Sequence, residues 1–226
     1  MLIALRGALN LELLADRAIW LPATQSLLLA DLHMGKAQSF RNQGLPVPAG
    51  TTEVTLARLE NLVRAWPVHE LIILGDFLHD RHAQRSDALR QFAAWRTRHP
   101  ALAIHLVRGN HDKHAGDPPP ECGLAVHTSA IKRAGLLLCH EPAEHTGSFV
   151  VAGHIHPVVW LAGAVDRLRL PCFWLREDSL ILPAFGEFTG GWPVEPAPTD
   201  RLFASDGERV HEIPALHAVR RRRRGH

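Results

Sequence analysis

Four short polar clusters, each placed directly after a hydrophobic run, constrain the fold of this chain more than any other feature. The clusters are Asp31-Leu32-His33, Gly75-Asp76, Gly109-Asn110-His111-Asp112 and Gly153-His154-Ile155-His156. The runs before them, at residues 26–30, 71–74, 102–107 and 149–152, have strand length and mostly lack polar alternation, which is typical of strands covered on both faces. Because open α/β sheets place their ligands at the carboxyl ends of strands, we expect the clusters to meet at one edge.

The order of the predicted elements indicates the fold class. Further strand-like runs occupy residues 136–139 and 180–182, and helical spacing of apolar residues covers 52–66 and 86–98. Thr52 is the expected N-cap of the first helix and Pro67 its stop. Strands alternate with helices in the first half and follow one another in the second. We therefore predict an α/β fold, a four-layer α/β/β/α sandwich of two mixed sheets flanked by helices.

Length and charge bound the organisation of the chain. Its 226 residues suit one large domain, which we place at residues 1–218, followed by a basic C-terminal tail, 219–226, that we expect to be disordered. The run Arg220 to Arg224 holds five of the 25 Lys and Arg residues, so 20 remain against 23 acidic residues. The near-neutral body does not imply a wholly basic nucleic-acid-binding surface and leaves a local basic stripe open.

The cysteines and the hydropathy of the chain indicate where in the cell the protein is expected. Cys122, Cys139 and Cys172 are odd in number and widely spaced, which argues against a disulfide framework and against a thiolate zinc site. No apolar stretch approaches the roughly 18 residues that a membrane span requires, and residues 1–6 do not resemble the start of a signal peptide. We expect a soluble, cytoplasmic protein with no membrane partner.

The side chains in the four clusters favour a metal site. Taken alone, an Asp after a strand is usually a turn former, and a lone His is usually a surface or core residue. Four clusters in one chain favour metal binding, and the glycines before Asp76, Asn110 and His154 let the backbone come close to bound ions. Carboxylate, amide and imidazole groups together suit Mn²⁺, Fe²⁺ or Zn²⁺, and two such ions sharing one carboxylate lie about 3.5–4 Å apart.

As a set, residues 31–35, 75–79, 109–112 and 153–156 resemble the signature of the calcineurin-like metallophosphoesterases, in its usual order. The resemblance implies a metallophosphoesterase sandwich that binds one ion through Asp31, His33 and His156, and in which Asp76 bridges to a second ion. The second ion would be bound by Asn110, His140 and His154. Glu141 stands where many members have glycine, so His127 and His145 remain open as alternatives to His140.

The same resemblance implies the catalytic roles. His111 would contact the scissile phosphate and stabilise or protonate the leaving oxygen. Asp112 would orient the His111 imidazole, or would instead cap a helix or turn. A hydroxide bridging two divalent ions, which we expect to be Mn²⁺ with Fe²⁺ or Zn²⁺ as alternatives, would attack phosphorus, so no serine or cysteine nucleophile is needed.

Residues 31–41, continuing through 44–52, are similar to the bacterial ligase-associated DNA-damage-response metallophosphoesterases, which are described as endonucleases. This similarity implies a phosphodiesterase that acts on single-stranded or damaged DNA in repair, in functional association with a repair ligase and helicase. Lys36, Arg41 and Arg108 lie near the predicted rim and are expected to bind backbone phosphates, the alternative being ordinary surface charge. The basic tail is either a nucleic-acid tether or an incidental solubilising end.

Two other functions stay open on the sequence. One is a phosphoesterase for small nucleotides or cyclic nucleotides, with the same ions in a closed pocket. The other is a non-catalytic repair scaffold, whose usual mark is a missing ligand or a lost counterpart of His111. Here that set is intact, so the scaffold ranks below the two enzymes.

Overall fold

The protein, seen here in a computed structural model, contains two mixed sheets, and the structure describes residues 1–5, 9–142, 147–162 and 166–214. The first sheet has the order β1-β2-β3-β4-β5-β6-β7. Strands β1 to β4 pair antiparallel, whereas β4 to β7 run parallel. The strands are β1 (Leu2–Ala4), β2 (Asn10–Leu14), β3 (Ala18–Leu21), β4 (Ser26–Leu29), β5 (Glu70–Leu74), β6 (Ala103–Val107) and β7 (Ala125–His127).

The second sheet has the order β14-β11-β12-β13-β10-β9-β8, with β15 paired to β12 and β16 paired to β15. Strands β9, β10 and β13 are parallel, and β11 forms a long antiparallel pair with β12. The strands are β8 (Ile131–Arg133), β9 (Leu136–Leu138), β10 (Phe149–Ala152), β11 (Pro157–Ala162), β12 (Arg167–Leu175), β13 (Ser179–Ile181), β14 (Trp192–Pro193), β15 (Arg201–Ser205) and β16 (Val210–Ile213).

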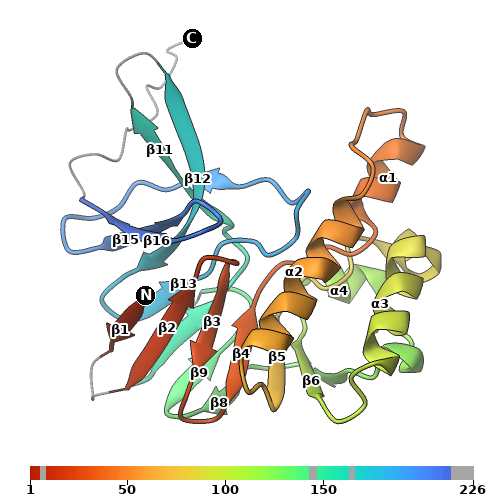
Figure 1. The fold of residues 1–226 in the computed structure, drawn as a ribbon, viewed down its shortest axis with the longest axis horizontal. Coiled ribbons are helices and arrows are strands. Elements are labelled where there is room, and N and C mark those ends of the chain that lie inside the picture. Colours follow the sequence, from red (N-terminus) through yellow and green to blue (C-terminus); the bar gives the residue numbers. More distant parts are fainter. Residues whose placement is uncertain (6–8, 143–146, 163–165, 215–226) are drawn as a thin grey trace.

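The helices lie along the outer side of the first sheet (Figure 1). They are α1 (Lys36–Asn42), α2 (Thr51–Ala65), α3 (Asp87–Thr97) and α4 (Asn110–Ala115), with short 3-10 helices at Arg81–Arg85 and Pro120–Cys122. The predicted helices at 52–66 and 86–98 correspond to α2 and α3. Ser86 caps α3 by accepting a hydrogen bond from the Leu89 amide, and α2 begins after Gly50. The predicted fold class, two mixed sheets flanked by helices, is confirmed, with the helices of the described residues all between β4 and β7 in sequence.

Two cores explain the near-continuous apolar runs of the central strands. Leu28 and Ile72 are completely buried between the two sheets, where they join Phe173 and Phe203 of the second sheet. Their neighbours along the strands point the other way and pack under α2 and α3 against Phe92 and Trp95; these are Leu27, Leu29, Leu71 and Ile73. Both faces of β4 and β5 are therefore covered, as expected for parallel strands at the centre of a layered fold.

The edge where the parallel strands end carries the polar clusters. Strands β4, β5 and β6 run parallel, so the loops that follow them start at the same edge of the first sheet. Strands β9 and β10 end in the same way in the second sheet. None of the helices in the described part of the chain is both long and apolar enough to cross a membrane. The predicted tail, 219–226, lies outside the described residues.

Candidate metal centre

Two sets of metal-binding side chains converge at this edge and share one carboxylate. The ligand atoms of the first set, Asp31, His33, Asp76 and His156, all lie within 4.8 Å of one another, and so do those of the second set, Asp76, His140 and His154. His156 Nε2 lies 3.3 Å from Asp31 Oδ1, and His140 Nε2 lies 3.4 Å from Asp76 Oδ1. Asp76 belongs to both sets, which is the position that a bridging ligand requires.

Asn110 completes the second set. Its Oδ1 atom lies 2.8 Å from His140 Nε2 and 3.0 Å from His154 Nδ1. The structure therefore brings together all seven residues that the sequence predicts as ligands. Of the alternatives to His140, His127 pairs with the His105 ring instead, and His145 lies outside the described residues.

The backbone of five of these residues is in the left-handed region. The φ angles are 58° at Asp31, 47° at His33, 48° at Asp76, 69° at His154 and 51° at His156. Such conformations cost on the order of 1–3 kcal/mol each and persist where surrounding contacts enforce them. Here the Asp31 amide donates to Gly75 O, the His33 amide donates to Asp76 O, and the His154 amide donates to the Asp31 carboxylate. Strain concentrated in the two ligand sets indicates a functional site.

Three glycines leave room for the ligands. A Cβ atom on Gly75 would lie 2.1 Å from His140 Nδ1, and one on Gly109 would lie 2.2 Å from Asp76 Oδ1. A Cβ atom on Gly153 would lie 2.7 Å from Asp31 Oδ2. Each glycine precedes a predicted ligand, and each allows the backbone to approach a ligand from another strand, as the sequence indicates.

Burial makes this cluster dependent on a counter-charge. Asp31 is completely buried and Asp76 is 2% exposed. Burial raises the pKa of Asp76, and the charge of Asp31 raises it further, whereas His140 opposes the shift. Burial likewise lowers the pKa of His33 far below its usual range, so its ring is neutral and able to bind metal.

Several buried ligand atoms have no hydrogen-bond partner among the described residues. They are Asp31 Oδ1, His33 Nδ1, His33 Nε2 and His156 Nε2. Buried polar atoms of folded proteins are nearly always hydrogen-bonded, so carboxylate and imidazole atoms without partners that gather at one place are typical of a cation site. The residues present therefore fit divalent metal ions, with Asp76 between the two sets.

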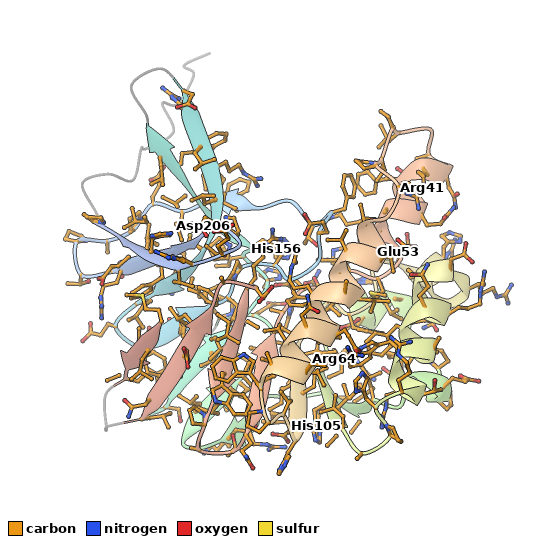
Figure 2. All side chains as sticks on the ribbon, in the orientation of Figure 1. Arg41, Glu53, Arg64, His105, His156 and Asp206 are labelled. Atoms are coloured by element: carbon orange, nitrogen blue, oxygen red, sulfur yellow. The ribbon has the colours of Figure 1, made fainter. Side chains whose placement is uncertain are left out.

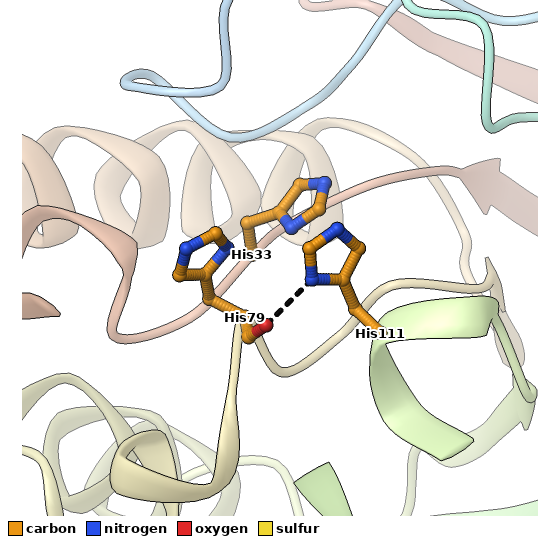
Figure 3. Close-up of side chains that lie close together, drawn as sticks. All are labelled: His33, His79 and His111. Atoms are coloured by element: carbon orange, nitrogen blue, oxygen red, sulfur yellow. Dashed lines mark hydrogen bonds between the residues drawn. The ribbon is translucent and has the colours of Figure 1, made fainter. Parts of the chain in front are cut away.

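A third group, His33, His79 and His111, adjoins the first ligand set (Figure 3). His111 Nδ1 lies 2.6 Å from the carbonyl oxygen of His79, and because a carbonyl only accepts, Nδ1 is the donor. Nε2 is therefore the ring nitrogen of His111 that does not take part in this hydrogen bond. The rings of His79 and His111 are stacked, with centroids 5.1 Å apart. His79 is absent from the predicted site, although it ends the motif Gly75-Asp76-Phe77-Leu78-His79, so its signal was present in the sequence.

Asp112 lies apart from the His111 ring. Its carboxylate is completely buried and accepts hydrogen bonds from the backbone amides of Leu78 and Gly109, at 2.8 and 2.9 Å, and of Phe77 at 3.3 Å. It thus ties the loop after β5 to the start of α4. This geometry agrees with the capping interpretation of Asp112, and the carbonyl of His79 is the group that orients the imidazole.

The three basic residues predicted to bind substrate occupy different environments. Lys36 Nζ donates to Thr189 O at 2.9 Å; burial lowers its pKa, and the charges of Asp31 and Asp76 oppose that shift. Arg41 lies exposed on α1, away from His156 (Figure 2). Arg108 is bound to the Asp117 carboxylate, with its Nη2 atom 2.5 and 2.7 Å from the two oxygens, so its charge is already paired.

A sandwich of two mixed sheets with an aspartate shared by two ligand sets at the strand ends defines a metallophosphoesterase. A model of the calcineurin-like phosphoesterase family matches residues 25–135, and the chain belongs to that family. It is similar to the crystal structure of Pseudomonas putida nuclease MPE, with 46% sequence identity, a TM-score of 0.83, and coverage of 94% of this chain and 99% of that one.

A second solved structure, a protein of unknown function from Aquifex aeolicus, is 20% identical, covers 58% of this chain and 78% of that one, and has a TM-score of 0.36. No curated protein matches the chain.

Replacing Gly75 by alanine tests whether the ligands depend on close backbone approach. Gly135 is the matched control, because it has the same left-handed φ, +81° against +80°, with nothing within 4 Å of the added Cβ. Gly135→Ala should lower the free energy of unfolding by about 1–2 kcal/mol through the backbone penalty alone. Gly75→Ala should lose about 1–3 kcal/mol more and weaken Mn²⁺ binding, because the methyl group displaces His140. Denaturant unfolding and metal titration measure both; equal losses would contradict the proposed packing.

The neutral state of His79 should be visible in the pH dependence of stability without metal. Burial, followed by the charges of Lys36 and His111, lowers the pKa of His79 to about 4 from 6.5. Between those values the unfolded chain takes up a proton that the folded chain does not, so stability falls as pH falls through this window. His79→Gln should flatten the fall in Tm, measured with a chelator present, whereas the exposed-residue control His82→Gln should leave it unchanged. Parallel curves for His79→Gln and the wild type would contradict this.

Proposed function

We propose that this protein is a two-metal phosphodiesterase that cleaves single-stranded or damaged DNA internally during repair. The observation that carries the proposal is the sharing of buried Asp76 by two ligand sets. Membership of a phosphoesterase family and similarity to a nuclease support phosphodiester hydrolysis. The DNA substrate, the endonucleolytic mode and the association with a repair ligase and helicase rest on the nuclease neighbour and on the similarity of residues 31–52 to the repair-associated members.

The chain's own residues would hold the ions as two sites. Asp31, His33 and His156 would bind the first, Asn110, His140 and His154 the second, and Asp76 both. When bound, the ions supply positive charge to the phosphate oxygens and lower the pKa of coordinated water toward neutrality. Oxygen and imidazole ligands without thiolate favour Mn²⁺, with Fe²⁺ or Zn²⁺ as alternatives.

His111 would act on the leaving group. Its Nδ1 proton is fixed on the His79 carbonyl, so Nε2 is the atom that can give a proton to the departing oxygen. His79 would support this role by stacking on the His111 ring and shielding it from water. Lys36, which lies close enough to Asp31 and Asp76 to interact with both charges, would add positive charge on the substrate side. Asp112 would act as a positioning residue, because it fixes the two loops between which His79 and His111 meet.

An extended substrate fits this site better than a small enclosed one. Next to the site, the cavity lined by His33 and Lys36 is only about 20 Å³, so this cavity does not enclose a small ligand, for which pockets are about 300–1,000 Å³. His154 is exposed, so the second ligand set opens to solvent. These features favour a polymer over a free or cyclic nucleotide. The complete ligand set with His111 beside it favours an enzyme over a scaffold.

Circular single-stranded DNA tests the proposal, since it has no ends for an exonuclease. The purified full chain, stripped of metal, should leave the circle intact and should linearise it when Mn²⁺ is restored. Asp76→Asn should abolish cleavage and lower the number of bound Mn²⁺ ions, while the control Asp87→Asn, at an exposed carboxylate, should behave as the wild type. Inactivity of the wild type on the circle with every divalent ion, or preference for cyclic nucleotides, would overturn the proposed DNA substrate.

His111→Ala separates proton donation from metal chemistry. General-acid catalysis contributes about 10²- to 10⁴-fold, so cleavage of DNA, whose leaving group is a poor alkoxide, should fall by about that factor. Hydrolysis of bis-p-nitrophenyl phosphate should fall much less, because nitrophenolate leaves without a proton. The bound Mn²⁺ should remain unchanged. Equal losses on both substrates would argue against the leaving-group role.

A further inference from the structure

We propose that one face of the β11–β12 hairpin binds single-stranded DNA as it leaves the metal centre, through Trp160, Arg167 and Arg169. The inference rests on the proposed function and adds a binding subsite to it. The hairpin consists of β11 and β12, and it projects from the body of the molecule on the opposite side of the site from α1 (Figure 1). Residues 163–165, between the strands, lie outside the described residues.

The hairpin starts at the metal centre. Strand β11 begins at Pro157, directly after the predicted ligand His156, which lies at the base of the hairpin (Figure 2). Because a strand rises about 3.3 Å per residue, Trp160 is about 13 Å along the chain from His156. That places it within a few nucleotides of a phosphate bound at the ions.

The pairing register shows which side chains share a face. Trp160 lies opposite Arg169, and Val158 lies opposite Pro171. Arg167 alternates with Arg169 and therefore shares its face. Further along β12, Phe173 and Leu175 lie on the same face as Arg169. Both pack between the two sheets, against the first sheet. The face with Trp160 and the two arginines is therefore a continuation of the face of β12 that packs against the first sheet.

The chemistry of this face fits a single-stranded polyanion. Trp160 is half-buried, whereas Arg167 and Arg169 are exposed. Arg169 Nη2 donates to Gly191 O at 2.9 Å, which orients a guanidinium that carries five N–H donors. Aromatic rings that stack on bases, combined with cationic groups along the backbone, are the usual means of binding single strands without sequence preference.

The reverse face of the hairpin has different chemistry. It carries Val159 and Leu170, which belong to an apolar cluster with Val194, and the exposed Leu168. Arg167 and Arg169 are the only charged residues within β11 and β12, so the charge of these strands is confined to the face that carries Trp160. In a body that is close to neutral, two charges next to an aromatic ring form a local basic stripe.

Two exposed residues on or near the hairpin serve as matched controls. Trp192 is 65% exposed and pairs with Pro157, whose side chain shares the reverse face with Val159. Arg176 is exposed just beyond the far end of β12, where it lies over the Trp174 ring. Trp192→Ala removes an exposed indole, and Arg176→Ala removes an exposed guanidinium, without altering the proposed face.

The test measures KM and kcat of the Mn²⁺-loaded full chain on a polythymidine oligonucleotide and on bis-p-nitrophenyl phosphate, which is too small to reach the hairpin. Trp160→Ala should raise KM for the oligonucleotide about 5- to 100-fold. The double variant Arg167→Ala/Arg169→Ala should raise KM and reduce the slope of log KM against log[salt] by about 1.4, at about 0.7 per phosphate contact. Both should hydrolyse bis-p-nitrophenyl phosphate like the wild type, which also shows that they are folded.

The outcomes separate this inference from the proposed function. If both hairpin variants cleave the oligonucleotide with the KM and the salt slope of the wild type, the inference about the hairpin is overturned. The proposed function is not affected by that result. Equal losses in Trp192→Ala or Arg176→Ala would also overturn the inference about the hairpin, because the binding face would then lie elsewhere. A wild type that hydrolyses bis-p-nitrophenyl phosphate but not the oligonucleotide would overturn both.

Discussion

The carboxylates of Asp31 and Asp76 are buried next to each other, and the folded protein has to offset the energetic cost of that burial. Asp31 and Asp76 are almost completely removed from water, and burial holds the pKa of the neighbouring His33 far below its usual range. Burial of uncompensated carboxylates is expensive, so the site is incomplete without bound cations. The left-handed backbone of Asp31, His33 and Asp76 and the glycines that make room for the ligands add to this cost. The two apolar cores, on the two faces of β4 and β5, stabilise the fold and so offset this energetic cost.

The predicted metal ligands and the groups that would act on substrate come from different parts of the fold. Four of the predicted ligands follow the parallel strands β4, β5 and β6 of the first sheet, and the other three follow the parallel strands β9 and β10 of the second sheet. The groups that would act on substrate lie on the connections, with His111 at the start of α4 and Lys36 at the start of α1. The β11–β12 hairpin then extends from ligand His156 itself. A change of substrate within such a frame would require changes in these connections and not in the ligands.

Much of the fold could be predicted from the sequence, because buried parallel strands leave continuous apolar runs. The motifs at the strand ends and the family resemblance together named seven residues as ligands, and the structure brings these seven side chains together. The helices α1 and α4 were not predicted, since each is too short for a helical period to be visible. Local motifs could not show that the Asp112 carboxylate turns toward backbone amides, or that Asp117 pairs with Arg108. These contacts join segments whose approach depends on the tertiary fold. His79 ends a motif that is visible in the sequence, but its stacking on the His111 ring depends on the tertiary fold.

The central claim is that Asp76 bridges two cations, and anomalous diffraction tests it most directly. Crystals of the full chain grown with Mn²⁺ and measured at the manganese edge should show two peaks about 3.5–4 Å apart with the Asp76 carboxylate between them. One peak should lie beside Asp31, His33 and His156, and the other beside His140 and His154. A single peak, or a pair of peaks away from Asp76, would contradict the account.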